Sequence, residues 1–116
     1  MTLTTKIERA IVTRLVSDLD AVGFIPVCVY TGEDYEPANT LETVLEHVFS
    51  VDESTIHFAP KSDPGKWGKF GVFCVCGNGA DLISDYHCGN AEFSGAVEGA
   101  SRMFDGPEDI YTAEGK

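Results

Sequence analysis

The most informative stretch of the chain is Trp67–His87, which reads WGKFGVFCVCGNGADLISDYH. Strand-forming residues occupy both ends of it, from Trp67 to Cys76 and from Asp81 to His87. Between them, residues 77–80 read Gly-Asn-Gly-Ala, and an Asn-Gly pair between two such runs is the strongest short-range signal of a β-hairpin. The stretch therefore predicts two antiparallel strands joined by a glycine-rich turn.

Upstream of this hairpin, hydrophobic residues recur twice at helical spacing. The first helix is predicted to begin at a capping box formed by Thr5 and Glu8, and to end at Gly23. The second is predicted to open at Asn39, and both Glu42 and Glu46 are expected on its solvent side.

Two further strands are predicted at residues 24–30 and 55–58, and Pro26 places the first of them at the periphery of the sheet because proline lacks an amide donor. Downstream of the hairpin, Asn90 caps a last helix that stops at Gly106-Pro107. The predicted buried stripe of that helix is Phe93, Ala96, Val97, Ala100 and Phe104.

The predicted order of elements is α-β-α-β-β-β-α. This order indicates an α+β fold, with one antiparallel sheet and helices packed on one of its faces. The length of 116 residues fits a single domain, which we assign to residues 1–106, with a flexible C-terminal tail at 107–116.

The charge distribution is the second informative feature. The chain has 19 acidic and 8 basic residues, and between Arg14 and Lys61 it has no lysine or arginine. That interval holds the following carboxylates: Asp18, Asp20, Glu33, Asp34, Glu36, Glu42, Glu46, Asp52 and Glu53. A formal net charge of -11 repels nucleic acids and anionic lipid and speeds encounter with a basic partner.

A stiff row of carboxylates can occupy the positions where a nucleic-acid-binding protein expects phosphates. The predicted partner-binding residues are Glu33, Asp34, Tyr35, Glu36, Glu42, Glu46, Asp52 and Glu53, with Tyr30 adding contact area. The alternative is that the acidic surface only keeps the protein soluble. The basic loop of Lys61, Lys66 and Lys69 around Trp67 is too small to outweigh the acids, and we expect no direct binding of nucleic acid.

Sulfur and imidazole groups form a further candidate site, because the hairpin could bring Cys74, Cys76, His87 and Cys88 close together. Structural zinc sites commonly use a C-x-x-C knuckle on a turn, whereas this C-x-C lies in an apolar strand. Asp85 could orient His87, but no nucleophile accompanies them. We therefore expect no catalytic residue, no metal and no cofactor.

The glycines of the turn do not form a phosphate-binding loop, since a strand follows them instead of a helix. Gly95 and Gly99 make one side of the last helix smooth, which permits close packing within the monomer or a homodimer. The sequence shows neither a membrane span nor a signal peptide, and the cysteines read as free thiols, so a cytoplasmic location is expected.

A resemblance adds to this interpretation. The tryptophan-led strand at Trp67, the Gly-Asn turn and the strand Asp81–Tyr86, DLISDY, resemble a pattern in small uncharacterised proteins of phages and plasmids. The stretches Val29–Glu33 and Phe49–Glu53 are similar to that group as well. By class, acidic proteins of this size resemble anti-CRISPR and antirestriction proteins, which occupy the nucleic-acid groove of a host defence complex.

The sequence and the resemblance together predict a non-enzymatic acidic protein of a mobile element, which binds a basic surface on a nucleic-acid-binding subunit of a host defence complex and blocks it, in the cytoplasm of the host cell. Two alternatives stay open: a small metal- or thiol-dependent enzyme that uses the cysteine and histidine set, and a structural, self-assembling phage protein.

Overall fold

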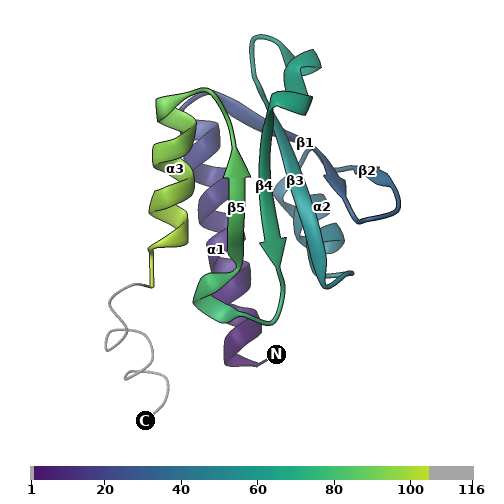
Figure 1. Ribbon diagram of the computed structural model, residues 1–116, viewed down its shortest axis with the longest axis vertical. Helices are drawn as coiled ribbons and strands as arrows, with labels where there is room; N and C mark the ends of the chain where they lie inside the picture. The colour runs from purple at the N-terminus through teal and green to yellow at the C-terminus, as the bar shows by residue number, and fades with distance from the viewer. Residues whose placement is uncertain (1, 105–116) are drawn as a thin grey trace.

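A computed structural model describes residues 2–104 (Figure 1). The elements follow one another as α1 (Leu3–Ala21), β1 (Phe24–Tyr30), β2 (Tyr35–Pro37), α2 (Leu41–Val48), β3 (Glu53–Pro60), the 3-10 helix η1 (Pro64–Lys69), β4 (Phe70–Val75), the 3-10 helix η2 (Gly79–Asp81), β5 (Ile83–His87) and α3 (Ala91–Ser101). The predicted tail at 107–116 and the predicted stop at Gly106-Pro107 lie outside the described residues.

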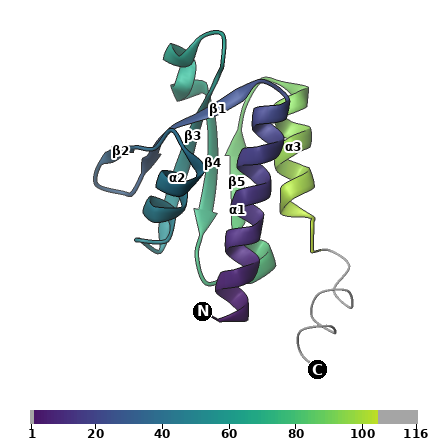
Figure 2. The same ribbon diagram turned by 180° about the vertical axis from the view of Figure 1, so that it is seen from behind.

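The strands form one antiparallel sheet in the order β2-β1-β3-β4-β5. The three α-helices lie on one face of this sheet and leave the opposite face, which we call the open face, without a helical layer (Figures 1 and 2). The predicted α+β class and the placement of the helices are confirmed. Strand β2 was not predicted, because residues 31–37 read as a polar acidic loop.

The edge formed by β1 and β2 explains why Pro26 is tolerated. β2 pairs only with the second half of β1, from Cys28 to Tyr30. β3 pairs with β1 along its whole length, with a register shift between Pro26 and Cys28. The predicted peripheral position therefore holds only for the first half of β1, because β2 is the edge strand beside the second half. The missing amide of Pro26 interrupts no second ladder.

Helix α1 begins earlier than predicted. Its N-cap is Thr2, whose Oγ1 accepts a hydrogen bond from the backbone N–H of Thr5 at 3.1 Å. The predicted capping box of Thr5 and Glu8 is therefore wrong, because the Glu8 carboxylate is buried against another part of the chain. At the other end Gly23, with a φ of 98°, allows the sharp exit into β1, as predicted.

The cap of helix α2, by contrast, lies one residue later than the predicted opening at Asn39. The N-cap is Thr40, and its hydroxyl and that of Thr43 bond reciprocally to each other's backbone N–H in a capping box. Val44 and Val48 face the core, so Glu42 and Glu46 are exposed on the opposite side of the helix, as predicted.

The predicted hairpin is confirmed, with β4 paired to β5 from Gly71↔His87 to Cys74↔Ile83. The connection is longer than four residues, because η2 forms inside it. Gly77 and Gly79 both have positive φ, at 101° and 62°, which a residue with a Cβ rarely adopts. The strand also starts later than predicted, because Trp67 belongs to η1 and not to β4.

The core lies between the sheet and the helices and is built around four phenylalanines. Phe93 of α3 is fully buried, and its ring centroid lies 5.1 Å from that of Phe24, 5.8 Å from Phe58 and 5.3 Å from Phe70. Such tilted and edge-to-face contacts add to the hydrophobic stabilisation. The remaining fully buried large side chains are Ile11, Val12, Leu15, Leu19, Val29, Val44, Val48, Ile56, Val72, Leu82 and Val97.

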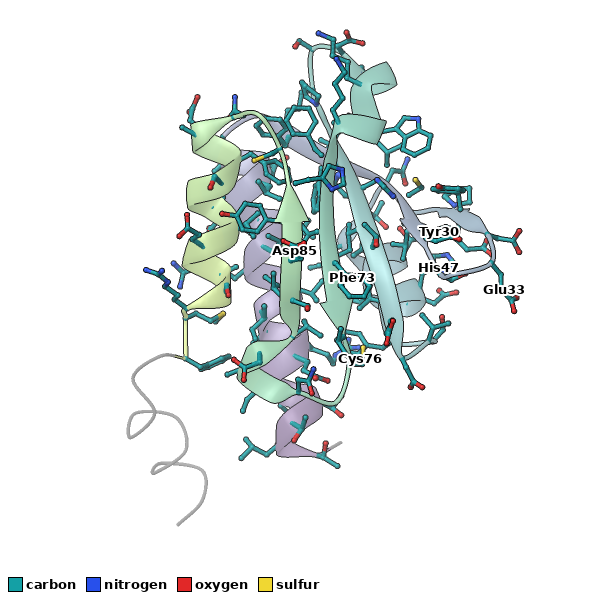
Figure 3. The ribbon with its side chains drawn as sticks, viewed as in Figure 1. Tyr30, Glu33, His47, Phe73, Cys76 and Asp85 are labelled. Carbon is teal, nitrogen blue, oxygen red and sulfur yellow. The ribbon has the colours of Figure 1, made fainter. Side chains whose placement is uncertain are left out.

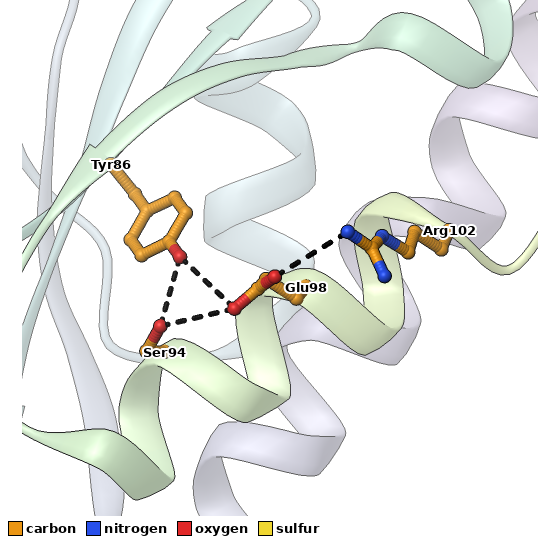
Figure 4. Close-up of polar contacts among 4 residues, drawn as sticks. All are labelled: Tyr86, Ser94, Glu98 and Arg102. Carbon is orange, nitrogen blue, oxygen red and sulfur yellow. Dashed lines mark hydrogen bonds and ion pairs between the residues drawn. The ribbon is translucent and has the colours of Figure 1, made fainter.

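Helix α3 begins at a side-chain cap and is joined to the sheet by a polar network. The side chain of Asn90 accepts from the backbone N–H of Phe93 at 2.9 Å, which confirms the predicted cap. The hydroxyl of Tyr86 on β5 lies 2.8 Å from Ser94 Oγ and 3.4 Å from Glu98 Oε2, and Glu98 in turn pairs with Arg102 at 3.6 Å (Figure 4).

The small-residue side of α3 fits close packing only in part. A Cβ on Gly99 would lie 3.7 Å from Arg14 Nη2 of α1, whereas a Cβ on Gly95 would meet no atom within 4 Å. Among residues 2–104, no helix has both the length and the apolar composition that a membrane crossing requires.

Candidate functional site

The predicted partner-binding residues lie at the end of the molecule formed by β2, α2 and the start of β3 (Figure 1). Glu33 and Asp34 are exposed in the β1–β2 turn, and Figure 3 shows Glu33 at the far edge of the molecule. Tyr35 and Glu36 lie on β2. Glu42, Glu46, Asp52 and Glu53 are all exposed on α2 and on the turn into β3.

None of the seven predicted carboxylates is in an ion pair with a base of the described chain. The ion pairs of residues 2–104 are Arg14–Asp18 at 3.0 Å, Lys61–Asp20 at 2.9 Å, Lys66–Asp63 at 3.8 Å and Arg102–Glu98 at 3.6 Å. Lys61 and Lys66 of the basic loop thus pair with acids near them. The negative charge at the β2/α2 end is left for solvent or for another molecule to compensate.

These acids do not form one row. Tyr35 pairs with Tyr30, and Glu36 pairs with Val29, so successive residues of β2 point to opposite faces of the sheet. Glu36, opposite the buried Val29, lies on the helix-covered face. Helix α2, which carries Glu42 and Glu46, lies on that face as well (Figure 2). Glu53, two positions before the open-face residue Thr55 on β3, lies on the open face. The acidic surface therefore wraps around the edge of the sheet.

An aromatic cluster on the open face adjoins this acidic edge. We call Tyr30, Tyr35, His57 and Trp67 the open-face cluster. The ring of Tyr35 lies 4.6 Å from Tyr30, 5.7 Å from His57 and 5.6 Å from Trp67, measured between centroids, and His57 lies 5.3 Å from Trp67. Sequence reasoning named both tyrosines for the site but missed His57 and Trp67.

The signal for His57 was its place in the alternation of β3, where Ile56 and Phe58 are fully buried on the helix-covered face. Trp67 had no such signal, because η1 folds back against β3 to bring it there. The Nδ1 atom of His57 is buried without a hydrogen-bond partner. Burial, and then the neighbouring His87, lower the pKa of His57.

The sulfur and imidazole set is not assembled by the hairpin. Cys76 follows β4 at its turn end, whereas His87 pairs with Gly71 at the other end of the hairpin. In the part of the chain that the structure describes, no three His, Cys, Asp or Glu side chains gather in a group that could hold a metal ion. The four residues therefore have no shared site.

The thiols next to the turn are held in their protonated form. Burial, followed by Cys76 and Glu8, raises the pKa of Cys74 to about 12. Burial, followed by the charges of Glu8 and Asp52, raises the pKa of Cys76 to about 11. Because the thiolate is the form that attacks and that binds metals, this environment is opposite to that of a reactive cysteine.

The glycine turn does bind an anionic group, but one from its own chain. Oε2 of Glu8, which is 3% exposed, accepts from the backbone N–H of Gly77 at 2.6 Å and of Gly79 at 3.0 Å. A cleft of about 430 Å³ opens beside this contact and includes Asp52 and Cys76 in its walls. Glu8 thus fastens α1 to the β4–β5 turn.

Comparison of the chain with known protein families, with curated proteins and with solved structures finds no match.

Proposed function

We propose that this protein is a non-enzymatic binding protein whose acidic end docks on a basic surface of a partner protein and blocks it. The observation that carries the proposal is the set of seven carboxylates around the edge formed by β2 and α2, none of which is in an ion pair within residues 2–104. Leaving like charges together costs folding energy through their repulsion. A partner that supplies Lys and Arg relieves that repulsion and gains speed of association.

The partner class that we favour is the nucleic-acid-binding subunit of a host defence complex, with the protein encoded by a mobile element and acting in the host cytoplasm. Such a subunit presents a groove lined with cations and releases counterions when phosphates fill it. Carboxylates on both faces of one sheet edge fit the walls of a groove better than they fit a flat surface.

The thiol enzyme is the weaker candidate, because the raised pKa values of Cys74 and Cys76 oppose thiolate chemistry.

The test is capture of nucleic-acid-binding proteins by the immobilised protein, with three versions compared across a range of salt concentrations. These are the wild type, the double variant Glu42→Lys/Glu46→Lys, and a matched control, Glu92→Lys/Asp81→Lys. The control changes the net charge equally, and both of its exposed acids lie outside the proposed surface.

We expect the wild type and the control to capture a nucleic-acid-binding complex that salt and added duplex DNA both release. The Glu42/Glu46 variant should capture much less. Equal capture by all three versions, or capture that DNA does not compete, would remove this surface from consideration.

A further inference from the structure

The register of the sheet places the open-face side chains in two rows. One row runs Tyr35, Tyr30, Thr55, Phe73 and Asp85 across the five strands. The neighbouring row runs Pro37, Cys28, His57, Gly71 and His87. Phe73 and Asp85 are seen on this face in Figure 3. The open face therefore carries a concentration of rings that the helices do not cover.

Within the open-face cluster, Tyr35 is the most accessible ring. It is 56% exposed, and among the described residues no other large hydrophobic residue is exposed. Tyr30 and Trp67 are half-buried, and their ring centroids lie 4.6 and 5.6 Å from that of Tyr35. Contact with two neighbouring rings restricts the rotation of the Tyr35 side chain, which lowers the entropy cost of binding to it.

The charges around these rings indicate which kind of chemical group would bind to them. Glu33 and Asp34 directly precede Tyr35 in the β1–β2 turn, and neither is in an ion pair with a base in the described part of the chain. On the other side, η1 carries Lys66, which is paired with Asp63 at 3.8 Å, and Lys69. The side of Tyr35 that faces the β1–β2 turn is therefore more negatively charged than the side that faces η1.

A guanidinium group can interact with both the rings and the carboxylates, because it stacks on aromatic faces and bonds to carboxylates in a planar fork. An ammonium group is more strongly hydrated and gains less from the rings. We propose that the open-face cluster, together with Glu33 and Asp34, is a recognition site for an arginine side chain of the basic partner. This inference rests on the proposed function and specifies which side chain of the basic partner is recognised.

The test uses the one tryptophan of the chain, Trp67, as a built-in fluorescent reporter of the cluster. The full chain is titrated at low salt with a short glycine-spaced arginine peptide. Matched peptides carry lysine, with the same charge, or citrulline, which is neutral and nearly isosteric with arginine. A single-stranded oligothymidylate tests the alternative that the rings stack on bases.

We expect the arginine peptide to change the fluorescence of Trp67 and to bind about two- to fivefold more tightly than the lysine peptide, with no binding of citrulline. Tyr35→Ala should abolish the preference for arginine, while Tyr35→Phe, which keeps the ring, should retain it. Because Tyr35 is exposed, Tyr35→Ala is expected to fold, and circular dichroism checks that it does.

The possible failures are distinguishable. Equal affinity for the two cationic peptides, or an arginine preference that survives in Tyr35→Ala, overturns the arginine site but leaves charge-driven binding intact. Binding of oligothymidylate in place of the peptides overturns the arginine site in favour of base stacking. If neither cationic peptide binds at low salt, the arginine site and the proposed basic partner both fail.

Discussion

The buried carboxylate of Glu8 accepts a hydrogen bond from the backbone N–H of Gly77, although 69 positions separate the two residues in the chain. Gly79 donates to the same oxygen. A residue that the sequence assigned to a local helix cap thus joins the first helix to the most distinctive turn of the sheet. The contact is charge-assisted, which makes such bonds about twice as strong as neutral ones.

Replacing Glu8 by alanine should lower the free energy of unfolding by about 2–4 kcal/mol, because two backbone donors would lose their acceptor and a buried space would open. Urea unfolding followed by circular dichroism measures the change. The control is Glu46→Ala, an exposed helical position that should change stability by no more than about 0.5 kcal/mol. Equal stabilities of the two variants would show that the contact of Glu8 with the β4–β5 turn contributes nothing to stability.

Replacing Phe93 by alanine should be more costly still, at about 3–5 kcal/mol, because its ring is fully buried among Phe24, Phe58 and Phe70. Tyr35→Ala is the matched control, since it removes an aromatic ring from an exposed position. Thermal and urea unfolding of the two variants give the comparison. A loss below about 1 kcal/mol for Phe93→Ala would contradict the described core.

The thiol of Cys76 should resist alkylation. With its pKa at about 11 in place of the ordinary 9.0, the thiolate fraction near neutral pH falls by about 100-fold. We expect labelling with iodoacetamide, read by mass spectrometry of the Cys76 peptide, to be slower in the native protein than in urea by about that factor. Equal rates in the two conditions would mean that the thiol is neither buried nor held near Glu8 and Asp52.

Stability should fall as the pH drops below about 6.5, in part because of His57. Its pKa is lowered in the folded state, chiefly by burial, so below the ordinary value of 6.5 the unfolded chain binds a proton that the folded chain refuses. Replacing His57 by phenylalanine removes this group and should flatten the acid side of the stability profile.

The measurement is urea unfolding at about pH 7.5 and about pH 5.5, in the wild type and in His57→Phe. His47→Gln on α2 serves as the second histidine variant. An unchanged acid-side slope in His57→Phe would remove His57 as a source of the pH dependence.

The parts of the fold that could be predicted are those specified by neighbours in sequence. The turn around Gly77 and Gly79, the Asn90 cap and the exit at Gly23 all depend on side-chain or backbone properties of a few adjacent residues. The same logic placed the caps of α1 and α2 one to three residues away from Thr2 and Thr40, because several Thr and Asn residues compete at each helix start.

The remaining features depend on contacts between distant segments. Strand β2 has only three residues, including Glu36 and Pro37, and it exists because β1 is available to pair with it. For the candidate site, the exposure of the acids followed from their polarity. The approach of Trp67 to Tyr35 required η1 to fold back against the sheet, and no periodicity in the sequence reports that path.

The clamp between Glu8 and the β4–β5 turn also constrains the order of events on the ribosome. Synthesis delivers α1 first, and the two amides that its carboxylate needs leave the exit tunnel only after β1 to β4 have been made. Until then the apolar stripe of the nascent helix can contact β1 and α2, but the buried carboxylate of Glu8 has no bonding partner. Closure of the last hairpin is therefore the step at which the growing chain can first satisfy that carboxylate.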